Sequence, residues 1–281
     1  MCGAGVGSIT IIDHDSVDQS NLHRQQLFRE SDIGKSKAKT AQRELSAINS
    51  SVSITAISER LSPNNVRSLC KQNTLVIDSA DNFATSYLLS DICLELKRDL
   101  LSASVNRTFG YLGVFCNKAP SIRSVFPNLA EQQTSCETEG VTGPSVGIIA
   151  SYQAQEALKI LLGNSTLGGK ILYLDLWNYS QHTIDFSSAE EGPGAAIKLI
   201  STSQIDDTDW VVDVRPNIEI KASPQEFKVH QKVALADISE LQSRPQNQRI
   251  VLACKSGQRA LVAAQILAQD HTLSLAVVLP D

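Results

Sequence analysis

The sequence predicts an α/β protein: a mostly parallel β-sheet with helices on both faces, followed by a second, smaller α/β domain. Apolar, strand-like runs alternate with segments of helical period along the first two thirds of the chain. A polar stretch that contains Gly and Pro interrupts this pattern at residues 187–196, and a shorter strand-and-helix alternation follows it. We therefore predict domains at residues 1–186 and 197–281, joined by a linker at 187–196.

The elements follow in order from the start "MCGAGVGSITIIDHD", which is typical of a helix end, a tight turn and a strand. In the first domain, strands are expected at 8–15, 52–58, 74–82, 99–104, 111–116, 170–176 and 182–186, and helices at 35–48, 62–70, 86–96 and 143–163. Ser62 and Pro63 suit a helix start, because serine caps free N–H groups and proline loses nothing at the first helical position. Gly163 suits a left-handed helix cap. In the second domain, strands are expected at 209–215 and 249–253, and helices at 237–241 and 260–270.

Composition excludes several classes of function. The 281 residues include 30 acids and 25 bases, a net charge of −5 without a basic block, so nucleic acid is not expected as a partner. Neither a membrane span nor a signal peptide is present in the pattern. The six cysteines lack paired spacing and indicate thiols in a reducing cytoplasm.

Polar residues follow the predicted strands, where open α/β sheets bind their ligands. These residues are Asp15, Asn21, Arg24, Lys35, Lys37, Asp81 and Asn82. A carboxylate can accept from ribose hydroxyls, Arg and Lys can neutralise phosphates, and a further Asp can hold Mg²⁺. Taken together, their order suits a nucleoside triphosphate, although each residue alone is common at strand and helix ends.

Five motifs in this order resemble the ThiF/MoeB/HesA family, the bacterial relatives of ubiquitin-activating enzymes: "IIDHDSVDQSNLHRQQLF", "IGKSKA", "VIDSADNFATSYLLSDIC", "TSCETEGVTGPSVGIIASYQAQEALKILLG" and "KILYLDLW". The resemblance implies a Rossmann-like domain that uses ATP and Mg²⁺ to adenylylate the C-terminal Gly-Gly of a ThiS/MoaD-like sulfur carrier. It also leaves a homodimer possible. Carried over by position, Asp15 would bind ribose, Arg24 and Lys37 the phosphates, and Asp81 the Mg²⁺. Asn21 and Asn82 would complete the pocket.

Cys136 in "TSCETEG" matches a cysteine in the family's loop after the nucleotide site. Its neighbours Thr134, Ser135, Glu137 and Glu139 do not suit a core position. We therefore expect an exposed, functional thiol, although the adjacent carboxylates oppose a lowered thiol pKa.

The chain departs from the family at its start and in its zinc ligands. Family members begin with a strand and a Gly-rich loop at a helix N-terminus. Here the sequence begins inside that helix, and "GAGVG" precedes the first strand rather than following it, so its glycines are not expected to hold phosphate. Ser121 and Ser124 stand where a first zinc-binding CxxC pair would fall, and no second pair follows. We therefore expect no zinc.

Cys254 in "LACKSGQRA" lies at the end of an apolar strand, with a helix directly behind its loop. Backbone N–H groups and a helix N-terminus can stabilise a thiolate or persulfide there. With "VVDVR" (Asp213, Arg215), the segment resembles a rhodanese domain, which implies that a donor loads Cys254 with persulfide sulfur. The plain alternative is a core cysteine at a strand end.

Three hypotheses remain open from the sequence. The first is a cytoplasmic enzyme that adenylylates a carrier and transfers sulfur to it. The second is a relative that does not bind ATP and only docks the carrier, and the third is a sulfurtransferase alone. The four matched residues Asp15, Arg24, Lys37 and Asp81 favour the first hypothesis, whereas the missing loop favours the second. An upstream in-frame strand followed by G-x-G-G-x-G would reconcile the two.

Overall fold

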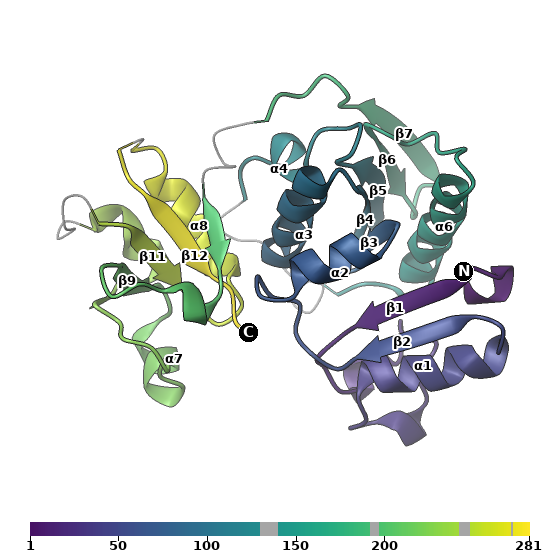
Figure 1. Cartoon of the computed structure of the whole chain (residues 1–281), viewed down its shortest axis with the longest axis horizontal. Coiled ribbons are helices and arrows are strands. Elements are labelled where there is room, and N and C mark those ends of the chain that lie inside the picture. Colours follow the sequence, from purple (N-terminus) through teal and green to yellow (C-terminus); the bar gives the residue numbers. More distant parts are fainter. Residues whose placement is uncertain (130–139, 192–196, 242–247, 271) are drawn as a thin grey trace.

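The computed structural model of the chain describes residues 1–129, 140–191, 197–241, 248–270 and 272–281. Its strands form a two-stranded sheet and two five-stranded sheets, with helices packed against them (Figure 1). The predicted α/β class is confirmed.

The first part of the chain supplies a two-stranded and a five-stranded sheet. Strands β1 and β2 pair in parallel, as do β3 and β4, whereas β5, β6 and β7 extend the larger sheet with antiparallel pairings. The strands are β1 (Ser8–Ile12), β2 (Ser53–Ile57), β3 (Leu75–Asp78), β4 (Asp99–Asn106), β5 (Phe109–Phe115), β6 (Lys170–Asp175) and β7 (Ser180–Asp185). The helices are α1 (Lys37–Ile48), α2 (Val66–Gln72), α3 (Phe83–Leu96), α4 (Ile122–Val125) and α6 (Gly143–Leu161), with 3₁₀ turns η1 (Cys2–Ala4), η2 (Gln19–Asn21) and η3 (Glu30–Asp32).

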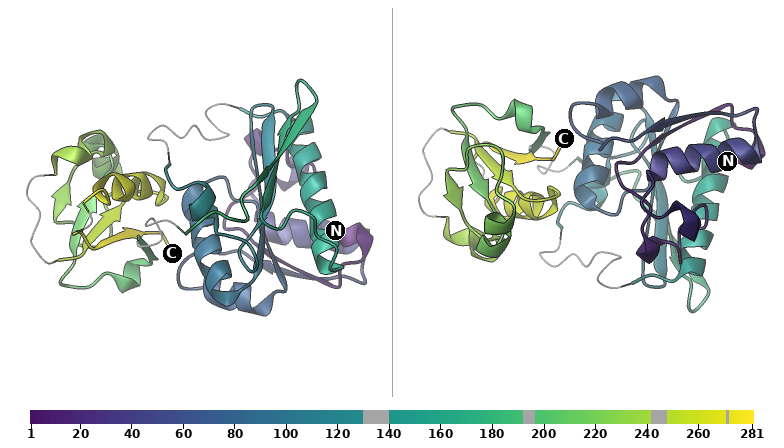
Figure 2. Two further views of the ribbon diagram at one scale, coloured as in Figure 1. Left: turned by 90° about the horizontal axis from the view of Figure 1, so that it is seen from above. Right: turned by 90° about the horizontal axis from the view of Figure 1, so that it is seen from below.

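The C-terminal lobe (residues 197–281) is built on an all-parallel sheet of order β10-β9-β11-β12-β8. Figure 2 shows this lobe beside α3 and α4 in both views. Its elements are β8 (Lys198–Ile200), η5 (Thr202–Gln204), β9 (Trp210–Asp213), α7 (Asn217–Ala222), β10 (Gln231–Lys232), η6 (Leu235–Glu240), β11 (Ile250–Ala253), α8 (Gln258–Leu267) and β12 (Leu275–Val278).

A cavity of about 1720 Å³ separates β1 from β3. Every residue of both strands lines it, although side chains alternate between the two faces of a strand, so each strand presents a backbone edge to the cavity. In the described part of the chain, β1 pairs only with β2 and β3 only with β4. The remaining edges of β1 and β3 are therefore open to the cavity.

One apolar core joins the two parts of the chain. Leu88 of α3 and Leu261 of α8 belong to the same cluster of buried side chains. The five cysteines in the described ranges are buried free thiols. None of the described helices is long and apolar enough to cross a membrane.

Helix ends were predicted with mixed success. Gly163 follows α6 with a φ of 72°, as expected for a left-handed position. The expected start of α2 at Ser62 and Pro63 is wrong, because the helix begins at Val66. Asn65 instead closes a turn: its side chain accepts from the Ser62 N–H at 3.0 Å and donates to the Arg60 carbonyl at 2.8 Å.

Candidate functional site

The cavity between β1 and β3 collects most of the polar residues predicted for the nucleotide site. Asp15 follows β1, Arg24 follows η2, Lys37 begins α1, and Asp81 and Asn82 stand between β3 and α3; all five line the cavity. Residues from four separate segments thus meet at one surface.

Lys37 and Asp15 form the central ion pair of this cavity. The Lys37 Nζ donates to Asp15 Oδ2 at 3.0 Å, and the Lys37 side chain is buried whereas half of the Asp15 side chain is exposed. Partial burial would by itself raise the pKa of Asp15, but the hydrogen bond and charge of Lys37 outweigh it, so the pKa lies below its ordinary value. Asp15 is therefore an anion at neutral pH, with one oxygen facing Lys37 and the other facing His14.

Arg24 and Asn21 belong to a turn that is held against α6. The Arg24 guanidinium donates to the Ser20 carbonyl at 3.1 Å. Asn21 is buried and does not line the cavity. A Cβ at Gly143, the first residue of α6, would overlap the carbonyl oxygen of His23, so a side chain there would push the turn away. Gly143 therefore fixes the position of Arg24.

Asp81 and Asn82 stand at the N-terminus of α3. Asn82 caps the helix by accepting from the Thr85 N–H at 2.9 Å, which leaves its amide group within 3.4 Å of an Asp81 carboxylate oxygen. The Asp81 side chain is exposed at the cavity wall. An exposed carboxylate at this place offers the hard oxygen ligands that Mg²⁺ prefers.

Two further cavity residues escaped the sequence prediction. The first is Gln25, whose Oε1 is buried and has no hydrogen-bond partner among the described residues. The sequence prediction included its neighbour Arg24 but not Gln25. Asp78 ends β3 and accepts from the Ser102 hydroxyl at 2.8 Å; its complete burial raises its pKa. The sequence could have indicated Gln25, because it follows Arg24 in the motif "NLHRQ". Asp78 has only a weaker sequence signal, its place at the end of a predicted buried strand.

Cys254 follows β11 and lies at the start of the loop that leads into α8. Its sulfur accepts from the Ala260 N–H at 3.5 Å, which confirms that a backbone N–H of the helix N-terminus points at the thiol. The Arg259 guanidinium lies beside the same sulfur and donates to both carboxylate oxygens of Glu219, at 2.8 and 2.7 Å. Cys254 is buried, as the plain alternative required, but a backbone N–H and the Arg259 guanidinium lie beside its sulfur.

Asp213 and Arg215 form a buried bidentate ion pair behind this loop. Arg215 donates to the two Asp213 oxygens at 3.0 and 2.7 Å and to the Ser223 carbonyl at 2.9 Å. The hydrogen bonds that Arg215 donates to Asp213 are the main reason that the pKa of Arg215 is raised. The pair thus holds β9 and α7 beside the Cys254 loop.

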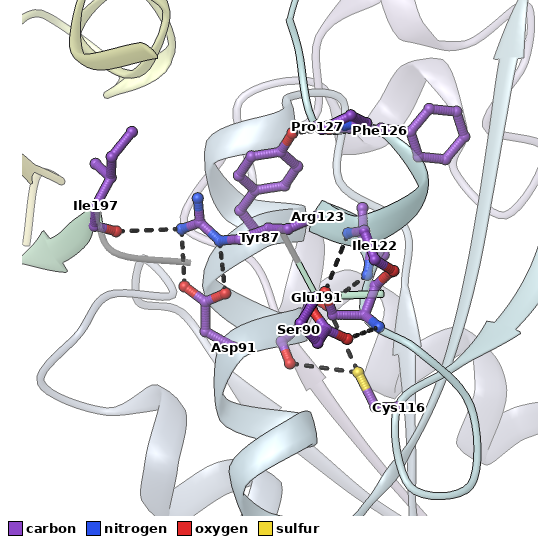
Figure 3. A network of polar contacts seen from close by, with 12 residues as sticks. Tyr87, Ser90, Asp91, Cys116, Ile122, Arg123, Phe126, Pro127, Glu191 and Ile197 are labelled. Carbon is purple, nitrogen blue, oxygen red and sulfur yellow. Dashed lines mark hydrogen bonds and ion pairs between the residues drawn. The ribbon is translucent and has the colours of Figure 1, made fainter. Parts of the chain in front are cut away.

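Ser121 and Ser124, at the positions of the first CxxC pair, begin the short helix α4. The Glu191 carboxylate accepts from the Ser121 N–H at 2.7 Å and from its hydroxyl at 2.6 Å, and Ser121 in turn accepts from the Ser124 N–H. Figure 3 shows the adjoining contacts, in which Arg123 donates to Asp91 and to the carbonyl of Ile197. Hydrogen bonds therefore tie the loop after β5 to the segment after β7. Cys136, Glu137 and Glu139 lie outside the described residues.

The ThiF family profile matches residues 1–195, more than two thirds of the chain. The chain belongs to the ThiF family.

Relatives of this ThiF chain share its first part. It is 40% identical over 179 residues to an adenylyltransferase and sulfurtransferase MOCS3 of Culex quinquefasciatus, an alignment that covers 62% of this chain and 41% of the relative. It is 38% identical over 167 residues to an adenylyltransferase and sulfurtransferase UBA4 of Kluyveromyces lactis, which covers 58% and 38%. The chain thus matches about two fifths of the length of these curated relatives.

Solved structures confirm the fold. Escherichia coli MccB, in a crystal structure with MccA-N7isoAsn, superposes with a TM-score of 0.57 at 21% identity over 66% of this chain and 59% of MccB. The PaaA structure gives a TM-score of 0.55 at 19% identity and covers 66% and 68%.

Proposed function

We propose that this chain adenylylates the C-terminal carboxylate of a small ubiquitin-like sulfur carrier and then passes sulfur to it through Cys254. The observation that carries the proposal is the cavity at which Asp15, Arg24, Lys37 and Asp81 meet. At one surface, these residues provide a carboxylate that can accept hydrogen bonds from ribose, two cations that can donate hydrogen bonds to phosphate, and a carboxylate that can bind a metal ion. The names of the relatives, adenylyltransferase and sulfurtransferase, support the same reaction.

In the first step, Asp15 accepts from the ribose hydroxyls, and Lys37 and Arg24 donate to the phosphates. Asp81 would hold Mg²⁺, because its carboxylate is exposed at the cavity wall, and the ion would supply positive charge beside the phosphates. A carrier carboxylate oxygen attacks the α-phosphorus, the bond from phosphorus to the bridging oxygen breaks, and pyrophosphate leaves with the electron pair.

In the second step, a persulfide on Cys254 attacks the acyl carbon of the carrier adenylate. The new carbon–sulfur bond forms as the bond to the phosphate oxygen of AMP breaks, and AMP leaves with that electron pair. A second thiolate then attacks the Cys254 sulfur and releases the carrier thiocarboxylate. The disulfide that this attack leaves is reduced by a thiol reductant. Ala260 N–H and Arg259 would hold the sulfur anion that each turnover creates.

The test is carrier-dependent exchange of labelled pyrophosphate into ATP, with a ThiS/MoaD-like protein ending in Gly-Gly. Lys37→Ala should reduce the exchange rate at least tenfold, whereas Lys39→Ala, at an exposed position on the same helix, should leave it unchanged. Equal rates for wild type and Lys37→Ala would contradict the assigned role of this cavity.

One observation favours a second candidate, a sulfurtransferase or carrier-docking protein without adenylylation. The contacts of the Cys254 sulfur with the Ala260 N–H and Arg259 suit sulfur binding without any use of the nucleotide cavity. Sulfur loading of Cys254 without any pyrophosphate exchange would identify the sulfurtransferase. Carrier binding without either activity would identify the docking protein.

The proposal extends to domains and partners. Since β7 ends at Asp185 and β8 begins at Lys198, we place the first domain at 1–186, the linker at 187–196 and a rhodanese-like domain at 197–281. The first domain is then the adenylylating unit, the C-terminal lobe takes sulfur from a persulfide donor, and a homodimer in the cytoplasm remains part of the proposal.

A further inference from the structure

We propose that the Cys254 loop and the nucleotide cavity are two ends of one continuous site within a single chain, joined at Gln258. The acyl-adenylate formed in the cavity would then be attacked by Cys254 of the same molecule. This inference rests on the proposed function and adds to it the route of the carrier tail.

Gln258 belongs to both ends of this site. It is the first residue of α8, four positions after Cys254, and it lines the same cavity as Asp81 and Asn82. Among the described residues, Gln258 is the one residue of the C-terminal lobe that lines the cavity, since the other lining residues all precede residue 174. The N-terminus of α8, directly after the thiol loop, therefore reaches the wall of the nucleotide cavity.

The backbone of Gly257 lies against the first turn of α3. A Cβ at Gly257 would stand 3.4 Å from the Cβ of Ala84, which is completely buried two residues after the Asn82 cap. The same Cβ would overlap Leu279, and the φ of Gly257 is 84°, so a glycine is required for this approach. The close approach of the loop to α3 is thus built into the sequence at this position.

Two helix N-termini meet where the loop touches α3. Asn82 is the N-cap of the 14-residue α3, and Gly257 is the N-cap of the 10-residue α8. Each N-terminus carries partial positive charge and unpaired backbone N–H groups. Such a junction suits two anions close together, the phosphate of an adenylate on the α3 side and a persulfide on the α8 side.

The C-terminal half of α8 is hydrogen-bonded to residues 127–129 of the first domain. The Leu129 N–H donates to the Gln265 Oε1 at 2.9 Å, and the Gln265 amide donates to the Pro127 carbonyl at 2.9 Å. Together with the shared core of α3 and α8, these bonds fix α8 against the first domain at two places. Helix α8, which follows the Cys254 loop, is therefore fixed against the first domain, with Gln258 at the cavity wall.

The first test uses an adenosine that carries a vinyl sulfonamide at its 5′ position, where the adenylate acyl carbon would stand. The Cys254 thiol would add across the double bond, with a new S–C bond at the terminal carbon and the proton on its neighbour, and mass spectrometry would find the adduct. Wild type should be labelled at Cys254, and excess ATP should suppress the label. Label on Cys136 alone would overturn the inference.

A mixture of two variants distinguishes transfer within one chain from transfer between chains. Cys254→Ser keeps the cavity, and a double variant Asp15→Asn, Lys37→Ala keeps the thiol. The mixture should lose the Cys254 label, whereas its return on the double variant would show transfer between chains and overturn the inference.

A second measurement is independent of nucleotide binding. Benzoylphenylalanine placed at position 258 should, on irradiation, cross-link to residues 81–85 of the same monomer; cross-links confined to the C-terminal lobe, or found only in dimers, would overturn the inference. Absence of probe and ATP binding would instead refute the proposed function, and the cross-link would then decide the inference alone.

Discussion

At the scale of single residues, the site depends on charges that are paired before any ligand arrives. Lys37 is buried and keeps the Asp15 carboxylate ionised, although burial alone would raise its pKa. Since the folded-state pKa of Asp15 is depressed, its stabilising contribution is present above the unfolded value of about 3.9 and is lost as the pH falls through the lower folded value. The pair therefore persists throughout the physiological range.

Removing Lys37 should raise the pKa of Asp15. In Lys37→Ala, burial of Asp15 acts without its main counterion, so the carboxyl group should titrate at a higher pH than in the wild type. Carbon-detected NMR titration of the Asp15 carboxyl measures this shift. Lys35→Ala is the matched control, because Lys35 contacts Asp32 at 3.1 Å, and it should leave the titration of Asp15 unchanged. An unchanged curve in Lys37→Ala would show that the ion pair does not control Asp15.

Cys254 should accept sulfur with help from Arg259. Thiosulfate should leave one extra sulfur on the protein, removable by cyanide, and Cys254→Ala should abolish this gain whereas Cys136→Ala should not. Arg259→Ala should reduce loading, because it removes the guanidinium that lies beside the sulfur. Arg249→Ala is the control, since Arg249 pairs with Asp209 instead. Equal loading of Arg259→Ala and wild type would contradict the role of Arg259.

At the scale of elements, the sequence was most informative where long periodic segments end in glycine or a polar cap. The helix that ends before Gly163 was predicted closely, and so was the order of strand-end residues that meet in the cavity. Strands β8, of 3 residues, and β12, of 4 residues, were not predicted. The predicted start of α2 at Ser62 is wrong because Asn65 forms a turn with Ser62, and the helix begins after that turn. The contact of Gly257 with Ala84 depends on tertiary packing and has no local signal.

Helix α6 positions the Arg24 turn through a glycine. Gly143→Ala should displace His23 and Arg24 and weaken nucleotide binding about tenfold or more, because the new Cβ overlaps a backbone oxygen. Gly147→Ala, in the same helix with open space around it, should leave binding unchanged and stabilise the fold by about 0.5–1 kcal/mol. Binding calorimetry and urea unfolding test the pair of variants. Equal affinity for Gly143→Ala and wild type would mean that the turn adapts.

The hydrogen bonds between Ser121 and Glu191 join the two chain segments that a zinc ion would otherwise link. We therefore predict that the purified protein contains no stoichiometric zinc. Serine hydroxyls are poor zinc ligands, and here both Ser121 donors are taken by Glu191. Metal analysis would contradict this by finding one zinc per chain. In Glu191→Gln the Ser121 amide should exchange its hydrogen faster, whereas Glu190→Gln should leave that exchange unchanged.

At the scale of the whole molecule, the two sheets of the first part stand apart while the two parts of the chain are joined. The cavity between β1 and β3 leaves two backbone edges open, yet α3 and α8 share one core. Nucleotide affinity therefore depends on how the described residues fill the phosphate side of the cavity. Helix N-termini and glycine loops supply backbone N–H donors for phosphate, and here the described donors are the side chains of Arg24 and Lys37 and the N-terminus of α3.

The chain should bind Mg²⁺-ATP at least about 100-fold more weakly than the same chain extended at its N-terminus by a strand and a G-x-G-G-x-G loop. Each charge-assisted bond to phosphate contributes about 1.5–3 kcal/mol, and two such bonds correspond to roughly this factor. Calorimetry of both chains, with Lys37→Ala in each, measures the difference. The extended strand should also pair with β1 and β3, which slowed amide exchange in residues 8–12 and 75–78 would report. Micromolar affinity of the chain without the extension would show instead that Arg24, Lys37 and Asn82 hold the phosphates without a loop.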